Sequence, residues 1–162
     1  MHEDYKKAFK WIVKLLDKNG IKFHFHGGLA AYSYGSKIRY NDIDLDMNLE
    51  DMLKLSSIAK EYVLEEPWTG ISSNKIWKGY LMVLKYQGVK IEITDAKNTK
   101  IFNKETGKYE RFPTDIKKPT VKEIFGLKVP IMPLENLIDY KSKLRFPNDL
   151  VDLKYLEKSR SA

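Results

Sequence analysis

The sequence contains no cysteine among its 162 residues, which excludes a disulfide framework and a thiolate metal site. It also lacks any run of about 18 consecutive apolar residues, so no segment is predicted to cross a membrane. The N-terminal stretch MHEDYKKAFKWIVKLL has no small-residue cleavage site and reads as an amphipathic helix rather than a signal peptide. These absences favour a cytoplasmic protein with no membrane partner.

Arginine is scarce, with four of the 29 basic residues, although the formal net charge is +7. The basic excess lies in segment 97–128, which has 9 basic and 4 acidic side chains. Such a segment is typical of proteins that bind a nucleotide or a nucleic acid. A lysine-rich surface that is merely solvated gives the same pattern, so the charge alone does not decide.

The hydrophobic pattern predicts one α/β or α+β domain over residues 1–162. Alternating apolar residues predict a mixed, largely antiparallel sheet, and helical spacing predicts flanking helices with a helical pair at the C-terminus, within 134–160. The expected helices are 4–18, 49–63 capped by Asn48, 134–145 and 148–159 capped by Asn148; the expected strands are 21–26, 42–47, 76–86 and 89–95, with a more exposed hairpin over 101–112. Segments around Pro67 and Gly70, and around Pro113 and Pro119, are expected to be irregular.

The stretch YNDIDLD places Asp42, Asp44 and Asp46 at every second position. In a strand these carboxylates share one face, whereas the aliphatic residues between them enter the core. Glu92, in the stretch KIEI, adds an acid on another predicted strand, although Asp95 competes for the same role. Asp42, Asp44 and Glu92 together suit hard divalent cations, two Mg²⁺ ions or Mn²⁺, which prefer oxygen ligands. The alternative is an acidic strand edge that faces solvent.

The stretch HGGLAAYSYGSKIRYNDIDLDM resembles the signature of the nucleotidyltransferase superfamily, which shares the catalytic fold of DNA polymerase β. That signature is a glycine pair, a spacer, and Asp-x-Asp between hydrophobic residues. Here Gly27 and Gly28 precede Asp42 by a spacer at the long end of the usual range. The pattern looks most like the small lincosamide and abortive-infection-toxin nucleotidyltransferases. The tail from Val129 to Leu156 is similar to their closing helices, and segment 97–128 is not covered.

The resemblance implies a Mg²⁺-dependent enzyme that transfers a nucleoside monophosphate from a nucleoside triphosphate, such as ATP, to a hydroxyl and releases pyrophosphate. It implies Asp42, Asp44 and Glu92 as the catalytic and metal-binding residues. The expected nucleotide-binding residues are Gly27, Gly28, Ser36, Lys37, Arg39 and Lys141.

Several alternatives stay open at this point. A non-catalytic nucleotide-binding or RNA-binding module, such as an antitoxin, could retain the fold. The acceptor could be a small molecule, a tRNA or a protein, and neither the nucleotide base nor the oligomeric state is indicated. His24 and His26 are expected to be packed or hydrogen-bonded rather than metal ligands, and Trp68 and Trp77 to pack rather than stack on a base.

Overall fold

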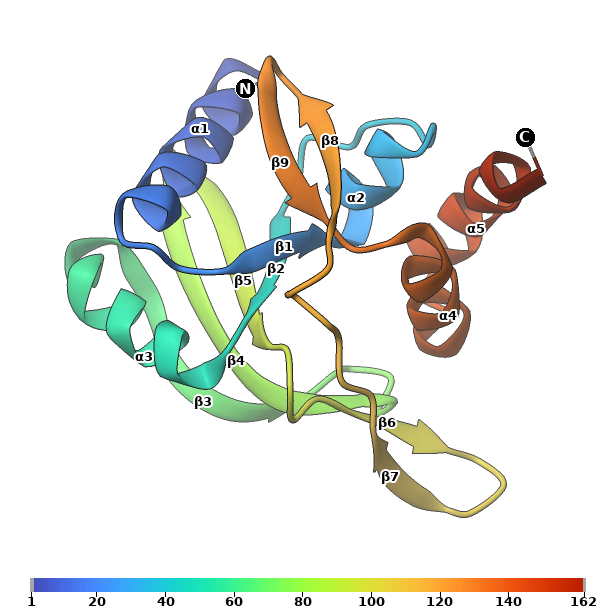
Figure 1. Cartoon of the computed structure of the whole chain (residues 1–162). Coiled ribbons are helices and arrows are strands. Elements are labelled where there is room, and N and C mark those ends of the chain that lie inside the picture. The colour runs from blue at the N-terminus through green and yellow to red at the C-terminus, as the bar shows by residue number, and fades with distance from the viewer. Residues whose placement is uncertain (1, 162) are drawn as a thin grey trace.

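The computed structural model describes residues 2–161, in which helices flank one mixed sheet (Figure 1). The helices are α1 (His2–Lys18), α2 (Gly27–Ser33), α3 (Leu49–Ile58), α4 (Leu134–Leu144) and α5 (Pro147–Ser161), with a 3-10 turn at Lys60–Tyr62. The strands are β1 (Phe23–His26), β2 (Ile43–Met47), β3 (Val63–Ile71), β4 (Trp77–Tyr86), β5 (Val89–Asp95), β6 (Lys100–Asn103), β7 (Lys108–Arg111), β8 (Thr120–Ile124) and β9 (Leu127–Ile131). No helix within residues 2–161 is long and apolar enough to cross a membrane.

The strands lie in the order β7-β6-β4-β5-β2-β1-β9-β8, and β3 pairs with β4 as well. Strand β2 is parallel to β5 and β1 is parallel to β9, whereas the other pairings are antiparallel. This arrangement confirms the predicted α/β class with a mixed, largely antiparallel sheet. Helices α4 and α5 pack against each other at the end of the chain, which confirms the C-terminal helical pair.

The core forms where the apolar face of α1 meets the central strands. Tyr5, Phe9, Ile12 and Leu16 follow helical spacing and are buried. The ring of Phe9 lies 5.3 Å from that of Phe25 on β1. Ile43 and Leu45, which alternate with the aspartates along β2, are fully buried in the same core. Because strand side chains alternate, this burial turns the aspartates to the other face of the sheet.

The largest departure from the sequence-based prediction lies between residues 49 and 71. The predicted helix 49–63 ends at Ile58, and β3 replaces the irregular chain expected around Pro67. Strand β3 pairs with β4, with register shifts on either side of Glu65. Proline lacks an N–H group and is therefore tolerated in a strand only where no ladder bond is needed, as at an edge or a bulge. The prediction missed β3 because this strand is largely exposed and carries little apolar periodicity.

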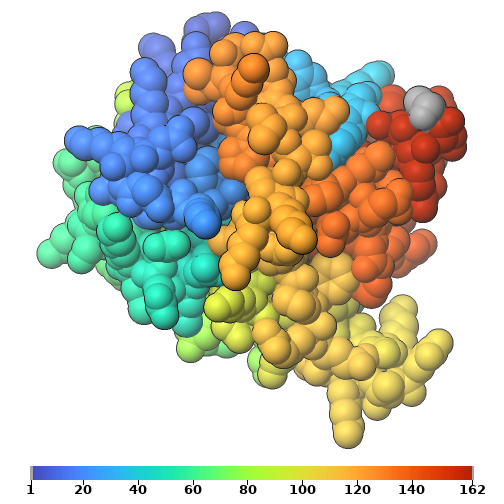
Figure 2. Space-filling model, viewed as in Figure 1, coloured from blue at the N-terminus to red at the C-terminus, as the bar shows by residue number. Residues whose placement is uncertain are grey.

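Two smaller predictions were also wrong. Helix α5 begins at Pro147, so Asn148 lies inside the helix rather than capping it; Asn48 does occupy the N-cap position of α3 as predicted, although its side chain makes no capping hydrogen bond. The chain after Pro119, expected to be irregular, forms the β8–β9 hairpin. By contrast, the hairpin predicted over 101–112 is present as β6 and β7. It extends away from the body of the molecule at the lower right of the view (Figure 2).

Candidate functional site

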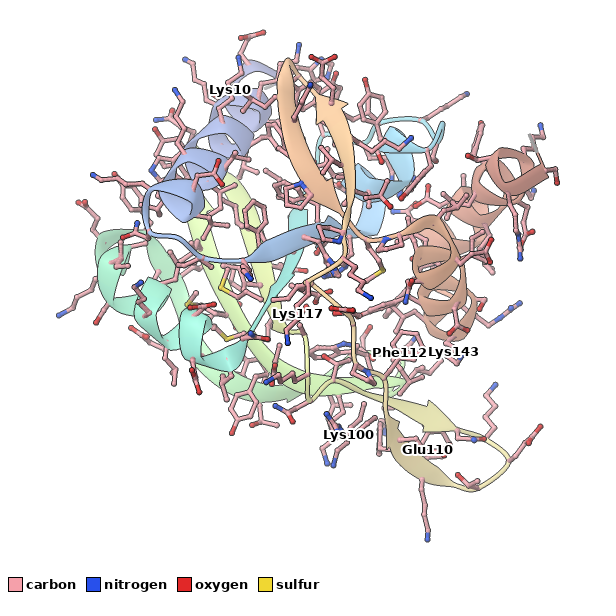
Figure 3. The ribbon with its side chains drawn as sticks, viewed as in Figure 1. Lys10, Lys100, Glu110, Phe112, Lys117 and Lys143 are labelled. Carbon is pink, nitrogen blue, oxygen red and sulfur yellow. The ribbon has the colours of Figure 1, made fainter. Side chains whose placement is uncertain are left out.

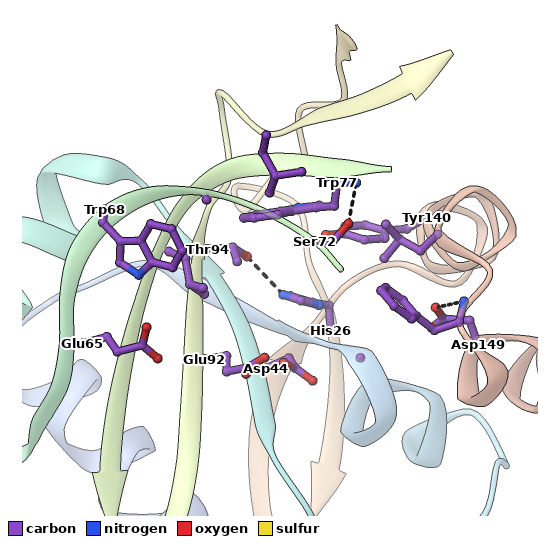
Figure 4. Close-up of a pocket in the computed structure, with 16 residues that line it drawn as sticks. His26, Asp44, Glu65, Trp68, Ser72, Trp77, Glu92, Thr94, Tyr140 and Asp149 are labelled. Atoms are coloured by element: carbon purple, nitrogen blue, oxygen red, sulfur yellow. Dashed lines mark hydrogen bonds between the residues drawn. The ribbon is translucent and has the colours of Figure 1, made fainter. Parts of the chain in front are cut away.

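A cavity of about 500 Å³ lies over one face of the sheet, beside α4 and the start of α5 (Figure 4). Its lining residues are His26, Gly27, Asp44, Glu65, Trp68, Gly70, Ile71, Ser72, Trp77, Leu81, Glu92, Thr94, Tyr140, Leu144, Phe146 and Asp149. The cavity therefore combines aromatic and aliphatic walls with several carboxylates.

Five residues at matching register positions form a row across the sheet. His26 on β1 is paired with Asp44 on β2, and Asp44 is paired with Glu92 on the parallel neighbour β5. Glu92 is paired in turn with Val83 on β4, and Val83 with Glu65 on β3. Residues in register on neighbouring strands project from the same face. The fold thus brings Asp44 and Glu92, far apart in sequence, side by side at the cavity.

It is energetically unfavourable for Asp44 and Glu92 to be ionised at the same time. Burial raises the pKa of Asp44 well above its ordinary value, and the charges of Glu92 and Asp42 raise it further. Burial also raises the pKa of Glu92, while a hydrogen bond with Asp44 lowers it and the charge of Asp42 raises it. Two like charges held on adjacent strands with little water are unfavourable unless a cation or a proton compensates them.

Gly27 allows the chain to pass close against Asp44. Its φ of +65° lies in the left-handed region, and a Cβ at this position would overlap the Oδ2 atom of Asp44. At Gly28 a Cβ would lie 3.1 Å from the guanidinium of Arg39. The glycine pair therefore permits two close approaches, one to a carboxylate of the site and one to a cation.

Asp42 occupies a different position from Asp44. It precedes β2, is half-buried and lines a separate hollow with Asp4, Tyr40 and Lys90. It nevertheless lies within electrostatic reach, because its charge raises the pKa of both Asp44 and Glu92. Within residues 2–161, no three His, Cys, Asp or Glu side chains are arranged to hold a metal ion by themselves. The pair at the cavity still suits Mg²⁺, which commonly takes one or two carboxylates and completes its shell with water and substrate phosphates.

Asp46 belongs to a buried hydrogen-bond network beneath the cavity. Its carboxylate accepts hydrogen bonds from the hydroxyls of Thr94 at 2.5 Å and Thr114 at 3.1 Å, and it lies 2.8 Å from Nε2 of His24. Nε2 of His26 is 3.5 Å from it. Burial would raise the pKa of Asp46, but the two histidines and Thr94 lower it to about 2. The histidines are hydrogen-bonded and packed, as predicted from the sequence.

Three of the predicted phosphate-binding residues gather around two carboxylates of α5. Arg39 donates two hydrogen bonds to Asp152, at 2.7 and 2.9 Å, and the hydroxyl of Ser36 donates one at 2.6 Å. Nζ of Lys141 lies 3.0 Å from Asp152 and 2.8 Å from Asp149. Burial would raise the pKa of Asp152, but these hydrogen bonds and the charge of Lys141 lower it.

The four predicted cationic or hydroxyl residues therefore divide into two groups. Ser36, Arg39 and Lys141 join the loop before β2 to helices α4 and α5 through buried polar contacts. Asp149 also lines the cavity, so Lys141 lies just behind its wall. Lys37 is exposed on the loop and, among the described residues, has no hydrogen-bond or ion-pair partner.

The basic segment 97–128 contributes to a second hollow, of about 580 Å³, between the β6–β7 hairpin and the end of α4. Lys104, Arg111, Lys143 and Arg145 line it together with two acids, one asparagine and four apolar residues. The ammonium of Lys143 lies 5.3 Å from the ring centroid of Phe112 (Figure 3). Most of the remaining lysines of this segment are exposed.

The sequence did not point to the part of the cavity that β3 and β4 form. Glu65 and Trp68 lie on β3, and Trp77 opens β4. The predicted helix ended at residue 63, and the chain around Pro67 and Gly70 was expected to be irregular. The signal for β3 is weak, because the strand is largely exposed and contains a proline. Only the pairing with β4 places these side chains over Glu92.

No family model matches the sequence, and no curated protein is significantly similar to it. Solved structures are similar in fold. A proposed nucleotidyltransferase from Thermotoga maritima superimposes with a TM-score of 0.70 and 22% identity over 99% of this chain and 93% of that one. The lincosamide antibiotic adenylyltransferase LnuA, bound to lincomycin, gives 0.60 and 18% over 93% and 95%. ANT(2'')-Ia, in complex with adenylyl-2''-tobramycin, gives 0.61 and 17% over 96% and 92%. The chain thus has the nucleotidyltransferase fold over nearly its whole length.

Proposed function

We propose that this protein is a Mg²⁺-dependent nucleotidyltransferase, which transfers a nucleoside monophosphate from a nucleoside triphosphate such as ATP to a hydroxyl group and releases pyrophosphate. The observation that carries the proposal is the pair of carboxyls at the cavity, Asp44 and Glu92, which lie in register on adjacent strands and whose pKa values are both raised, chiefly by burial. A site that holds two unneutralised acids in register is suited to a divalent cation. The fold shared with the adenylyltransferases supports the same reaction class.

The metal-binding residues would be Asp44 with Asp42 and Glu92. Bound Mg²⁺ would neutralise the phosphate oxygens and the leaving pyrophosphate. Asp42 lines a neighbouring hollow, and its charge raises the pKa of both cavity carboxyls, so it would add to the negative charge that attracts the cation. Gly27 would keep the chain close to the cavity carboxylate, since a Cβ there would overlap the Oδ2 atom of Asp44.

Glu92 would act on the acceptor. The acceptor oxygen attacks the α-phosphorus, the bond from that phosphorus to the bridging oxygen of the β-phosphate breaks, and the hydroxyl proton passes to the carboxylate of Glu92. The pKa of Glu92 is raised towards neutral pH, which makes this carboxylate a better general base than an ordinary glutamate. Lys141 lies within electrostatic reach of Asp44 and would offer positive charge to the phosphates from behind Asp149.

Calorimetric titration with ATP and Mg²⁺ tests the metal-dependent part of the proposal. We expect heat of binding from the unchanged protein and from Asp17→Asn, a matched substitution of an exposed acid on α1, and none from Asp44→Asn. Equal heats from all three proteins would contradict the proposal, because binding would then not depend on the cavity carboxylate.

Incubation with each α-labelled triphosphate, Mg²⁺ and a cell extract tests turnover. Label that moves to a new species, together with release of pyrophosphate, supports a transferase. Binding without transfer for every triphosphate would favour the non-catalytic binding module, for which the exposed basic hairpin β6–β7 would supply the partner surface.

A further inference from the structure

The β6–β7 hairpin and the start of β4 present two faces of different chemistry. Lys78 on β4 is paired with Lys100 on β6, and Lys100 is paired with Arg111 on β7. Residues in register on neighbouring strands project from the same face, which we call the outer face. Every side chain on the outer face of these three segments is a cation or an aromatic ring: Lys78, Tyr80, Lys100, Phe102, Tyr109 and Arg111.

The outer face is turned away from the catalytic cavity. Trp77, which lines that cavity, lies in the register row of Glu110 and therefore projects from the opposite face. The ring of Phe112 and the ammonium of Lys143 lie between the hairpin and α4, whereas Lys100 lies on the other side (Figure 3). The hairpin extends past the helices of the protein (Figure 1). A ligand on the outer face would therefore not enter the cavity.

The three cations of the outer face are not neutralised by the protein. None of them has an ion-pair partner within residues 2–161. The ammonium of Lys78 lies 5.4 Å from the ring centroid of Tyr109, and the guanidinium of Arg111 donates to the carbonyl oxygen of Lys97 at 2.9 Å. Like charges directly opposite each other destabilise a sheet. A bound polyanion would relieve this repulsion, because its charges would lie along the row.

The aromatic rings beside the row are held in place. Phe102 and Tyr109 meet edge to face, with ring centroids 5.3 Å apart, and the hydroxyl of Tyr109 donates to the carbonyl oxygen of Lys75 at 2.6 Å. Both rings are half-buried, and Tyr80 on β4 is 37% exposed. Fixed rings next to a row of cations suit a single-stranded nucleic acid, whose bases stack on the rings while its phosphates meet the cations. A duplex fits less well because its bases are already stacked on one another.

We propose that the outer face binds single-stranded nucleic acid. The row of Lys78, Lys100 and Arg111 spans three strands, or about 10 Å, and each cation takes one phosphate. The rings of Phe102 and Tyr109 receive the bases. An anionic membrane would also attract the cations, but this face has no aliphatic side chain to insert among lipid chains. The surface is separate from the proposed transferase site and does not depend on it.

Fluorescence anisotropy with labelled oligouridylate and oligothymidylate tests the surface, in the absence of triphosphate and Mg²⁺. Single strands lose affinity with a logarithmic salt slope of about −0.7 for each phosphate neutralised, so three contacts predict a slope of about −2. Binding should therefore weaken about twentyfold between about 50 and about 200 mM salt. A preference for either strand supports the proposal and identifies RNA or DNA as the ligand, since only RNA carries the 2′-hydroxyl.

The variants Lys100→Gln and Lys108→Gln form a matched pair on the hairpin. Both lysines are exposed, but Lys108 is paired with Asn103 and projects from the opposite face. We expect Lys100→Gln to weaken binding about fivefold at low salt and to make the slope shallower by about 0.7, because one phosphate contact is lost. Lys108→Gln should retain the slope of the unchanged protein. Equal effects of the two variants would overturn the proposal.

An abasic strand of the same length tests the aromatic rings. It keeps the phosphates and lacks the bases, so we expect it to bind about tenfold more weakly than oligothymidylate. Equal binding of these two strands, or no binding of any oligonucleotide at low salt, would overturn the proposal. Binding to vesicles of phosphatidylserine and phosphatidylcholine that only Lys100→Gln weakens would also overturn it, in favour of a membrane surface. Failure of the transferase proposal would appear as missing heat with ATP and Mg²⁺ and would leave these titrations unaffected.

Discussion

Replacing Asp44 with asparagine should make the ligand-free protein more stable at neutral pH. The buried carboxyl has a raised pKa, so the folded state must either keep a proton there or hold a charge beside Glu92. Asparagine has nearly the same shape, carries no charge and can donate a hydrogen bond to Glu92. The substitution therefore removes an electrostatic cost and leaves the packing against Gly27 in place.

The magnitude follows from the register of the two strands. Two unit charges about 4.8 Å apart at an effective dielectric constant of about 20 repel by about 3 kcal/mol. The pair avoids part of this cost by retaining a proton, so we expect a gain of about 2 kcal/mol in the free energy of unfolding. For a chain of this size, that gain corresponds to a rise of about 4–8 °C in the melting temperature.

The pH dependence provides the decisive assay. When a carboxyl has a higher pKa in the folded protein than in the unfolded protein, the folded protein loses stability as the pH rises from the unfolded-state pKa through the folded-state pKa. The ordinary value for Asp44 is 3.8, so the advantage of Asp44→Asn should be largest at pH 8 and shrink towards zero near that value. Thermal unfolding followed by circular dichroism at both pH values measures it, with Asp17→Asn as the control. A destabilised variant at pH 8, or a difference that does not change with pH, would refute this reasoning.

Three further outcomes follow from the same structure. Gly27→Ala should destabilise the protein and abolish binding of ATP with Mg²⁺, because a Cβ would overlap Asp44. Gly20→Ala is the control: it has the same φ of +65° but no atom within 4 Å, so it should lower the free energy of unfolding by only about 1 kcal/mol in thermal unfolding. Asp152→Ala should lower the free energy of unfolding by about 3–5 kcal/mol in denaturant titrations, since it leaves the partly buried Arg39 without its partner and the buried Lys141 with Asp149 alone. Asp46, with its pKa lowered to about 2, should contribute stability that is fully present above about pH 4 and lost as the pH falls towards 2, and Asp46→Asn should remove that dependence in acid titrations.

The pattern of apolar residues predicted most of the sheet, because buried strands and α1 carry strong periodicity. It also placed Asp44 and Glu92 on separate strands with aliphatic neighbours. Their pairing needs the parallel contact of β2 with β5, which only the full topology supplies. Strand β3 escaped prediction because an exposed edge strand is held by backbone pairing and leaves little hydrophobic signature.

The predicted phosphate-binding residues illustrate a second limit. Ser36 and Arg39 are predicted because they lie just before the strand of Asp44, and Lys141 because it is a cation among apolar residues of the tail helix. A sequence shows that such groups are available but not which carboxylates they meet in the folded chain. Here Asp152, more than a hundred residues beyond Ser36, accepts hydrogen bonds from both Ser36 and Arg39. The group thus holds α5 against the loop before β2, whatever further part Lys141 has towards a nucleotide.

Asp44 and Asp46 show most clearly how the fold separates two similar side chains. They share one strand and one face, two residues apart. Two histidines and two threonines surround the carboxylate of Asp46. Burial raises its pKa, but the histidines and Thr94 lower it to about 2. Asp44 faces the cavity beside another acid, and its pKa is raised. A structural carboxylate is stabilised by its own protein, whereas Asp44 lacks such compensation. The charge of Lys141 offsets only part of this cost. A bound cation would stabilise the ionised carboxylate further, which supports Asp44 rather than Asp46 as the proposed cation-binding residue.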